Sequence, residues 1–286
     1  MKVAVIGSNG QLGSDLIKVL GNKCIPLPHT EIEVTDFEQS KAMLTQHQPD
    51  VIINCAAYHR VDECENNVEK PFAVNVYGVR NVALIAREIG ATLLHFSTDY
   101  VFSGTQRTPY KETDPTNPIN VYGISKLAGE YFVRYLLEKH FVIRSSGLYG
   151  VAGSSKKGGN FVEIMLRFAR EGREIKVVGD QVLTPTYTEE LAKKVKELIQ
   201  TKEYGLYHIT NNGQCSWFEF AKAIFELSEL SPNLSETTTA AFGAAATRPP
   251  YSVLENAHLK QVGLDDMRVW REALKEYLEE RKRVRN

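Results

Sequence analysis

A tyrosine and a lysine stand four residues apart in the segment "VYGISKLAGE", which runs from Val121 to Glu130. The segment favours a helix, and positions i and i+4 of a helix share one face, so Tyr122 and Lys126 should point into the same space. An ammonium group beside a phenol favours the phenolate and lowers the phenol pKa from its ordinary value of about 10. The spacing therefore predicts a phenol that exchanges protons near neutral pH.

Two hydroxyl groups precede this pair at the end of a strand-like run, "LLHFSTDY". Ser97 and Thr98 fall where the predicted strand leaves the sheet, and ligands of open α/β sheets bind at the carboxyl ends of strands. A hydroxyl group there can donate a hydrogen bond to a substrate carbonyl while Tyr122 protonates it. The competing interpretation is a solvated Tyr/Lys surface pair, worth only roughly a few tenths of a kcal/mol.

Three glycines, Gly7, Gly10 and Gly13, occur in "VIGSNGQLGSDL", directly after a strand-like run and at the opening of a helical pattern. Glycine permits a tight turn there and lets a pyrophosphate approach the backbone and the positive end of the helix. Glycines alone also fit a plain tight turn, but the strand before and the helix after favour a dinucleotide cofactor.

The end of the second predicted strand, "CIPLP", bears on the choice of cofactor. NAD enzymes carry an acid there, roughly 20 residues past the glycines, which accepts the ribose hydroxyl group. Here the strand is followed by Pro28, His29 and Thr30, and Glu31 arrives late. The pattern favours NADPH with NADH tolerated, although no arginine stands at this position to hold a 2′-phosphate.

The elements that must position these residues alternate along the chain. Short apolar runs such as "KVAVI", "DVIINCAA" and "TLLHFST" are separated by longer helical patterns. Such alternation predicts an α/β fold with a Rossmann-type, doubly wound parallel sheet. We expect residues 1–146 to form the NAD(P)-binding domain. Residues 147–286 should form mainly a smaller substrate-binding lobe, interleaved with late elements of the main sheet.

Composition excludes several classes of partner. The 286 residues include 34 basic and 35 acidic residues, a formal net charge of -1, which points to neither nucleic acid nor a membrane surface. No apolar run approaches the roughly 18 residues that a membrane helix needs, and a strand-like run at Lys2 replaces a leader segment. The expected location is the cytoplasm.

Cysteine and histidine spacing predicts no metal site and no disulfide framework. No C-x-x-C pair occurs, so reduced thiols are expected; the four cysteines are Cys24, Cys55, Cys64 and Cys215. The seven histidines lack metal-ligand spacing. His95 and His208 lie in apolar strand-like runs and are expected to be core residues with satisfied ring nitrogens.

Together the glycine turn, "NCAA", "VNVYGVRN", "STDYVFSG" and "YGISK" resemble the extended short-chain dehydrogenases/reductases. More narrowly, "NPINVYGISKLAGE", "VVGDQVLTPTYTEELA" and "RPPYSVLENAHL" are similar to the dTDP-4-dehydrorhamnose reductase family, and the similarity runs from Met1 to the last helix. The resemblance implies hydride transfer from a nicotinamide cofactor to C4 of a nucleotide-linked 4-keto-6-deoxysugar, which makes dTDP-L-rhamnose for cell-surface polysaccharide.

The resemblance also implies roles for single residues. Thr98 would bind the 4-keto oxygen, Tyr122 would donate the proton, and Lys126 would hold the nicotinamide ribose and tune Tyr122. Further cofactor contacts are implied for Gly7, Gly10, Gln11, Leu12, Gly13, Ala56, Ala57 and Asn75. Some relatives use magnesium between subunits, an implication that no residue pattern here tests.

Several positions leave alternatives open. Gly147 stands where many of these reductases have a tryptophan near the sugar, so a platform for the hexose is missing. Asn160 can cap a helix or contact substrate. Arg248 can bind the nucleotide diphosphate or be a surface arginine. Lys156 and Lys157, in the loop Ser154–Gly159, can close over a pyrophosphate or stay solvated.

Two further hypotheses accompany the reductase. One is a non-catalytic, NADP-binding regulatory subunit resembling the β subunit of methionine adenosyltransferase, and the other is a reductase or epimerase of another nucleotide sugar. The intact Thr98, Tyr122 and Lys126 favour catalysis. The C-terminal helix should pack on the small lobe or on a second subunit of a homodimer; its expected apolar stripe is Val269, Leu274, Tyr277 and Leu278.

Overall fold

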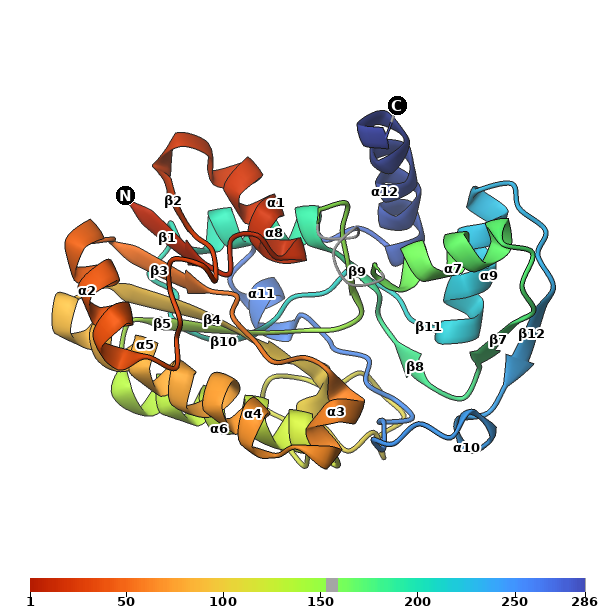
Figure 1. Cartoon of the computed structure of the whole chain (residues 1–286), viewed down its shortest axis with the longest axis horizontal. Helices are drawn as coiled ribbons and strands as arrows, with labels where there is room; N and C mark the ends of the chain where they lie inside the picture. Colours follow the sequence, from red (N-terminus) through yellow and green to blue (C-terminus); the bar gives the residue numbers. More distant parts are fainter. Residues whose placement is uncertain (153–158, 286) are drawn as a thin grey trace.

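A six-stranded parallel sheet forms the larger part of the protein, in a computed structural model that describes residues 1–152 and 159–285 (Figure 1). The strands lie in the order β10-β5-β4-β3-β1-β2. Every pairing among them is parallel. Their bounds are β1 Val3–Ile6, β2 Cys24–Leu27, β3 Val51–Asn54, β4 Thr92–Thr98, β5 His140–Ser145 and β10 Gly205–His208.

Helices cover both faces of this sheet because the strands are apolar on both faces. Along β3, Ile52 packs into one hydrophobic cluster and Ile53 into the other, as alternating side chains require. The first cluster lies under α2 (Phe37–His47), α5 (Val79–Ile89) and α6 (Val121–Leu136). The second lies under α1 (Gln11–Leu20), α8 (Thr188–Leu198) and α11 (Ala257–Gln261). The predicted doubly wound α/β sheet is confirmed.

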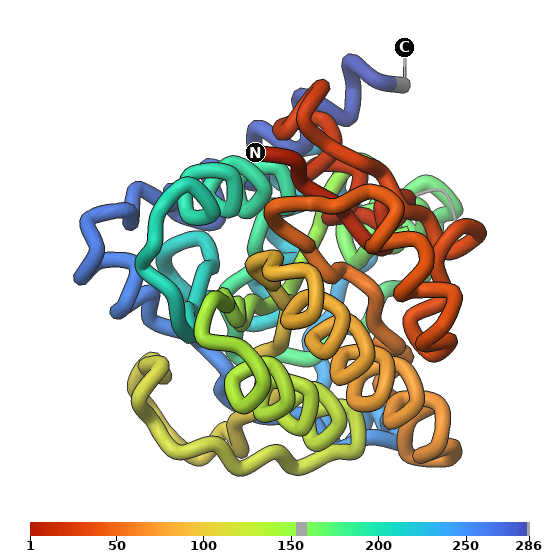
Figure 2. The backbone as a smooth tube through the Cα atoms, turned by 90° about the vertical axis from the view of Figure 1, so that its left-hand side faces the viewer, coloured from red at the N-terminus to blue at the C-terminus, as the bar shows by residue number. Residues whose placement is uncertain are grey.

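The segment between β3 and β4 is helical almost throughout. It contains α3 (Val61–Asn66), α4 (Glu69–Phe72) and a π-helix, η2 (Ala73–Gly78), which leads directly into α5. Figure 2 shows α5 and α6 side by side on one face of the sheet. Two short 3₁₀ turns, η1 (Gly21–Lys23) and η3 (Asp99–Val101), follow α1 and β4.

A smaller lobe lies beside the carboxyl ends of the strands (Figure 1). It is built from short strand pairs and helices: β6 Leu148–Tyr149, α7 Phe161–Arg170, β7 Ile175–Val178, β8 Val182–Leu183, β9 Thr186–Tyr187, β11 Cys215–Ser216, α9 Trp217–Leu227, β12 Leu234–Thr237, α10 Thr239–Phe242 and α12 Trp270–Arg285. Its core joins side chains from α7, α9 and α12. The boundary at residue 146 stays a prediction, because α8 and β10 return to the sheet from within the second half of the chain.

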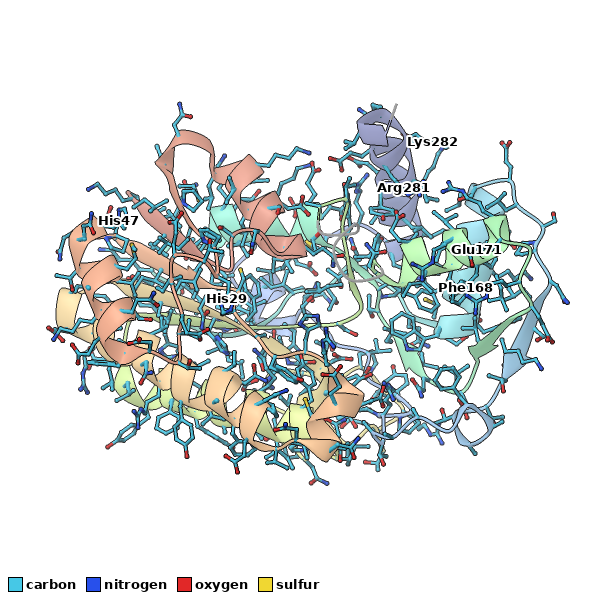
Figure 3. All side chains as sticks on the ribbon, in the orientation of Figure 1. His29, His47, Phe168, Glu171, Arg281 and Lys282 are labelled. Atoms are coloured by element: carbon cyan, nitrogen blue, oxygen red, sulfur yellow. The ribbon has the colours of Figure 1, made fainter. Side chains whose placement is uncertain are left out.

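The last helix, α12, packs on this lobe, which is one of the two expected positions. Figure 3 shows Arg281 on α12 and Phe168 on α7, and Arg281 forms an ion pair with Glu163 of α7. Leu274 is buried in the lobe core with Tyr277 and Leu278. The expected apolar stripe was wrong at Val269, which precedes the helix and is 46% exposed.

Candidate functional site

The strand order places a topological switch point between β1 and β3. The chain passes from β1 to β2 on one side and then to β3 on the other side of β1, so the connections after β1 and β3 diverge. Ligands of doubly wound sheets bind at such a switch point, beyond the carboxyl ends of the strands. The glycine turn follows β1 here, and Cys55, Ala56 and Ala57 follow β3.

The glycine turn packs too tightly for side chains. Gly7 has a φ of +75°, and a Cβ atom built on Gly13 would lie 2.3 Å from the Gly7 carbonyl oxygen. The helix α1 begins after Gly10, which provides no side-chain cap to the first amides. These amides and the positive end of the helix dipole suit a phosphate group, so the turn fits the pyrophosphate of a dinucleotide.

Gln11 connects the glycine turn to the smaller lobe. Its amide nitrogen donates to the Leu148 carbonyl at 3.1 Å, and its amide oxygen accepts from Asn160 at 3.0 Å. Asn160 is the N-cap of α7, because its Oδ1 accepts a hydrogen bond from the Glu163 amide at 3.1 Å. Of the two roles left open for Asn160 the structure shows the cap, and a contact with substrate stays a prediction.

Asn75 holds the loop that follows β3. Its Oδ1 accepts from the Tyr58 amide at 2.9 Å, while its Nδ2 donates to the Tyr58 carbonyl and to Ser125 Oγ of α6, both at 3.0 Å. Asn75 is fully buried. Its amide group therefore ties the loop that carries Ala56 and Ala57 to the helix that carries Tyr122, and a direct contact with the cofactor stays a prediction.

The start of α6 sets the position of Tyr122. Asn120 caps the helix by accepting from the Gly123 amide at 2.7 Å, and it donates to the Thr247 carbonyl at 2.9 Å. A Cβ atom on Gly123 would lie 2.2 Å from the Tyr100 carbonyl oxygen, so only glycine lets α6 approach η3 this closely. The rings of Tyr100 and Tyr122 then meet edge to face, with their centroids 6.0 Å apart.

Lys126 is buried below Tyr122 on the same helix, as the spacing predicts. Its Nζ donates to the Phe96 carbonyl of β4 at 2.5 Å. Burial lowers the pKa of Lys126 to about 8, against the opposing effect of Glu130 one turn further along the helix. The lysine thus sits at the carboxyl end of β4 with an amine that can lose its proton in a mildly alkaline medium.

The expected lowering of the Tyr122 pKa by Lys126 was wrong for this structure. Burial raises the pKa of the Tyr122 phenol above its ordinary value, and only a hydrogen-bonding interaction with Thr98 opposes that rise. The physical reason is that the Lys126 ammonium group is drawn to the Phe96 carbonyl. Tyr122 is therefore a protonated phenol at neutral pH, which is the form that a proton donor needs.

Thr98 ends β4 beside a buried carboxylate that the sequence analysis did not single out. Thr98 Oγ1 donates to Asp99 Oδ1 at 3.0 Å and accepts from the Tyr100 amide at 3.2 Å. Ser146 Oγ donates to the other carboxylate oxygen of Asp99 at 2.9 Å. The only sequence signal for this group was its position after the strand-end hydroxyls.

Ser97, the other candidate hydroxyl, belongs to a different network. It donates to Glu130 of α6, which also forms a buried ion pair with Arg144 of β5 at 2.7 Å. Ser97 therefore faces the helix layer, while Thr98, the next residue of the strand, faces the opposite side. Of the two candidates, Thr98 is the hydroxyl that interacts with Tyr122.

Arg248 lies near the site, but it is held by a carboxylate. Its guanidinium group makes two hydrogen bonds with Asp62 of α3, at 3.1 and 2.7 Å. It also interacts with the Tyr100 side chain. The sequence analysis missed Asp62, which no motif marks. Binding of a diphosphate by Arg248 stays a prediction, and it would require exchange of this carboxylate for phosphate.

Gly147 adopts a left-handed backbone conformation with a φ of +55°. A Cβ atom there would lie 2.8 Å from Leu183 Cδ1 and 3.1 Å from the Pro185 Cα atom. The backbone turn thus excludes a tryptophan in this conformation, beyond leaving the position without a ring. The candidate lid residues Lys156 and Lys157 lie outside the described residues.

The two strand histidines differ. His208 is buried with Nδ1 3.0 Å from the Tyr110 carbonyl and Nε2 3.5 Å from Arg144, so its expected satisfied state is confirmed. The same expectation was wrong for His95: neither ring nitrogen has a hydrogen-bond partner among the described residues. A buried Nδ2 of Asn54, its neighbour across β3 and β4, is also unpaired there.

The described residues contain neither a metal-binding cluster nor a membrane-spanning helix. Across residues 1–152 and 159–285, no three His, Cys, Asp or Glu side chains converge as the ligands of a metal ion would. None of the helices in this part of the chain combines the length and the apolar composition of a membrane span. All four cysteines are free, which confirms the expected thiols.

Comparison with known proteins gives consistent results along the whole chain. The family model of the RmlD substrate binding domain matches residues 1–283. The spore coat polysaccharide biosynthesis protein SpsK of Bacillus subtilis is 41% identical, over 98% of each chain. The dTDP-4-dehydrorhamnose reductase of Streptomyces griseus is 38% identical, over 95% of this chain and 91% of the relative.

Solved structures agree with these relatives. The dTDP-4-dehydrorhamnose reductase of Bacillus anthracis, determined in complex with NADP, superposes with a TM-score of 0.93 at 41% identity, over 98% of this chain and 100% of that chain. The chain therefore shares the fold of that reductase over nearly its whole length. The chain belongs to the RmlD substrate binding domain family, the group of the dTDP-4-dehydrorhamnose reductases within the extended short-chain dehydrogenases/reductases.

Proposed function

We propose that the protein is an NADPH-dependent reductase that converts dTDP-4-dehydro-L-rhamnose to dTDP-L-rhamnose. The observation that carries the proposal is the gathering of Thr98, Tyr122 and Lys126 at the carboxyl end of β4, in the same sheet whose switch point carries the glycine turn. The reductases that match the whole chain by sequence and by fold support the same reaction.

Each residue of the trio has one part in the reaction. When bound, NADPH supplies the hydride that adds to C4 of the keto-sugar. Tyr122 gives its phenolic proton to the C4 oxygen. Because burial raises the pKa of the phenol, Tyr122 stays protonated until the substrate takes the proton. Thr98 orients the same oxygen, and Lys126 would hold the ribose hydroxyl groups of the cofactor. The phenolate that remains on Tyr122 regains a proton from solvent.

The residues around the glycine turn support NADPH as the preferred cofactor. Leu27, at the end of β2, accepts a hydrogen bond from the Gly7 amide at 2.9 Å, which places the residues after β2 next to the turn. The first side chains there are Pro28 and His29, so the acid that binds the ribose hydroxyl group in NAD enzymes is replaced at these two positions. The carboxylate of Glu33 lies 3.4 Å from His29. NADH remains usable, because no arginine enforces the choice.

The direct test follows the absorbance of the reduced nicotinamide. The purified chain is mixed with dTDP-4-keto-L-rhamnose, generated in place from dTDP-glucose by the upstream enzymes, and with NADPH or NADH. Oxidation that requires both the sugar and the chain, faster with NADPH, is expected. Tight NADPH binding by calorimetry without oxidation would favour the regulatory alternative, or a different keto-sugar.

We also propose that the chain forms a homodimer and works in the cytoplasm. Three apolar side chains on the outer face of α6 support the dimer: Ile124, Tyr131 and Tyr135 are 44%, 56% and 85% exposed. Their spacing of seven and four residues puts them on one stripe. Free thiols at all four cysteines support the location.

Light scattering tests the dimer. The wild-type chain should scatter as a species of about 64 kDa, twice the chain mass of 32.2 kDa. The double variant Tyr131→Glu/Tyr135→Glu should scatter as a monomer with an unchanged melting temperature. A monomeric wild-type chain would remove the proposal.

A further inference from the structure

Three hydroxyl groups from distant parts of the chain converge on the buried carboxylate of Asp99. Thr98 at the end of β4 reaches one oxygen at 3.0 Å, and Ser146, after β5, reaches the other at 2.9 Å. Ser252, in the segment after the lobe strands, also hydrogen-bonds this carboxylate. All four residues are at least 95% buried. Three side-chain donors are more than the turn after β4 requires. One of the three, Thr98, is the hydroxyl group proposed to orient the substrate oxygen.

The direction of the Thr98 proton depends on this carboxylate. A hydroxyl group has one proton to donate. With Asp99 ionised, that proton points at the carboxylate, because an ionised acid can only accept. The Tyr122 phenol then finds an acceptor in Thr98 Oγ1, with which it interacts. Tyr122 then donates its proton to Thr98, and Thr98 donates its proton to Asp99. Neither proton is free to donate to the carbonyl oxygen of a substrate.

Protonation of Asp99 reverses the direction of the hydrogen bond between Thr98 and Asp99. A neutral carboxyl group donates to Thr98 Oγ1, which already accepts from the Tyr100 amide at 3.2 Å. With both lone pairs of Thr98 occupied, its own proton is directed away from Asp99, and the Tyr122 proton has lost its acceptor. Both hydroxyl groups can then donate to the same external oxygen, which is the arrangement that ketone reduction needs.

We propose that Asp99 is a positioning residue whose neutral form turns the Thr98 and Tyr122 protons toward the substrate carbonyl and whose ionised form turns them inward. The proposal rests on the proposed function, because it assigns the substrate oxygen as the shared acceptor. No covalent step is involved: one proton moves onto the carboxyl group from solvent, and the hydrogen bonds reorient.

The surroundings of Asp99 allow the neutral form near neutral pH. Burial raises the pKa of Asp99 to about 6, against the hydrogen bonds from the three hydroxyl groups. The titratable groups that face it are Tyr100 on η3 and Tyr122 on α6. Arg248, the cation that acts on Tyr100, is engaged by Asp62. A bound keto-sugar would exclude water and raise the pKa further.

The test compares pH profiles of kcat in the NADPH assay. Wild-type activity should fall as pH rises through the Asp99 pKa. Asp99→Asn mimics the neutral acid, because an amide nitrogen can donate to Thr98 while the amide oxygen accepts from Ser146. This variant should keep the low-pH kcat of the wild type and lose the decline near pH 6, with only the limb at higher pH remaining.

Ser146→Ala provides a second variant that leaves Thr98 and Tyr122 untouched. Loss of a hydrogen bond to the ionised form raises the Asp99 pKa, so the decline should move to higher pH by about one unit. Melting temperatures of all variants are measured alongside. If Asp99 only ties these segments together, the variants should have lower melting temperatures, but their pH profiles of kcat should keep the wild-type shape.

Thr98→Val separates failure of this inference from failure of the proposed function. If Thr98 orients the carbonyl, its removal should lower kcat about 10²-fold. A Thr98→Val variant with full activity would refute the role of Thr98 itself. If this variant is impaired and the profiles of Asp99→Asn and Ser146→Ala run parallel to the wild type, Asp99 has no part in directing the protons and the inference alone is overturned.

Discussion

At the scale of single residues, the proton donor of the site, Tyr122, has a pKa above that of an ordinary phenol. Burial raises the pKa of Tyr122 and lowers that of Lys126, so both groups are shifted toward their neutral forms in the described chain. Neutral forms are less costly to bury. At neutral pH the Tyr122 phenol is uncharged, and its negative charge develops only when the phenolic proton passes to a substrate oxygen.

Tyr122→Phe should abolish turnover and leave cofactor binding intact. The change removes only the phenolic oxygen, while the ring keeps its edge-to-face contact with Tyr100 at 6.0 Å. Loss of a general acid typically costs about 10²–10⁴-fold in rate. NADPH binding by calorimetry and turnover by absorbance check the two halves. Tyr77→Phe, at an exposed tyrosine of η2, serves as the control; a fully active Tyr122→Phe variant would exclude the phenol from the mechanism.

Gly147→Ala should destabilise the protein more than Gly172→Ala does. The left-handed backbone at Gly147 costs an L-residue about 1–2 kcal/mol, and the new Cβ atom meets Leu183 and Pro185. Gly172 has a similar φ of +64° with no atom within 4 Å of its built Cβ. Chemical denaturation of Gly147→Ala and Gly172→Ala isolates the packing contribution. Equal losses of unfolding free energy would show that position 147 is open space.

At the scale of elements, α1 and α8 pack together through a buried acid. Asp15 of α1 is 5% exposed and accepts a hydrogen bond from Thr188 of α8 at 2.5 Å. Burial is the main cause that raises the Asp15 pKa to about 6, and the nearby carboxylates of Glu280 and Glu189 contribute. The interface of the two helices therefore shifts Asp15 toward its protonated form, compared with an acid exposed to solvent.

Asp15→Asn should make the protein less sensitive to pH. A pKa that is higher in the folded than in the unfolded state means that folding binds a proton, so stability is full below pH 4 and is lost as pH rises toward 6. The difference of about 2 units corresponds to at most about 3 kcal/mol above pH 6. Melting temperatures at pH 5 and pH 8 check this. A wild-type protein that gains stability over that interval more than Asp15→Asn does would contradict it.

At the scale of the whole molecule, local patterns predicted the fold and half of the site. The glycine turn and the Tyr122–Lys126 spacing are written in short segments, so their geometry follows from a turn and a helix. The partners of Asp99 could not be predicted, because Ser252 lies far along the chain. The same holds for Arg248, which pairs with Asp62 across 186 positions. Such contacts depend on how the lobe returns to the sheet, which no local pattern records.

The chain should not divide into two independent folding units at residue 146. A fragment of residues 1–146 lacks β10, which pairs with β5, and α8, which packs in one hydrophobic cluster with Leu16 of α1 and Ile53 of β3. It should therefore aggregate or show little cooperative unfolding by circular dichroism. Mixing it with residues 147–286 should recover a cooperative transition. A fragment that melts sharply by itself would support the boundary that the sequence predicts.

The late return of β10 also affects the nascent protein. When β5 has left the ribosome, its free edge at residues 141–144 has no neighbour until residues 205–208 emerge. About 60 residues must be translated in between, which takes roughly 3–12 s at ordinary rates of synthesis. During that interval an apolar strand with an open edge is exposed to other nascent chains. Slowly translated messages should therefore lengthen the period in which this chain depends on chaperones.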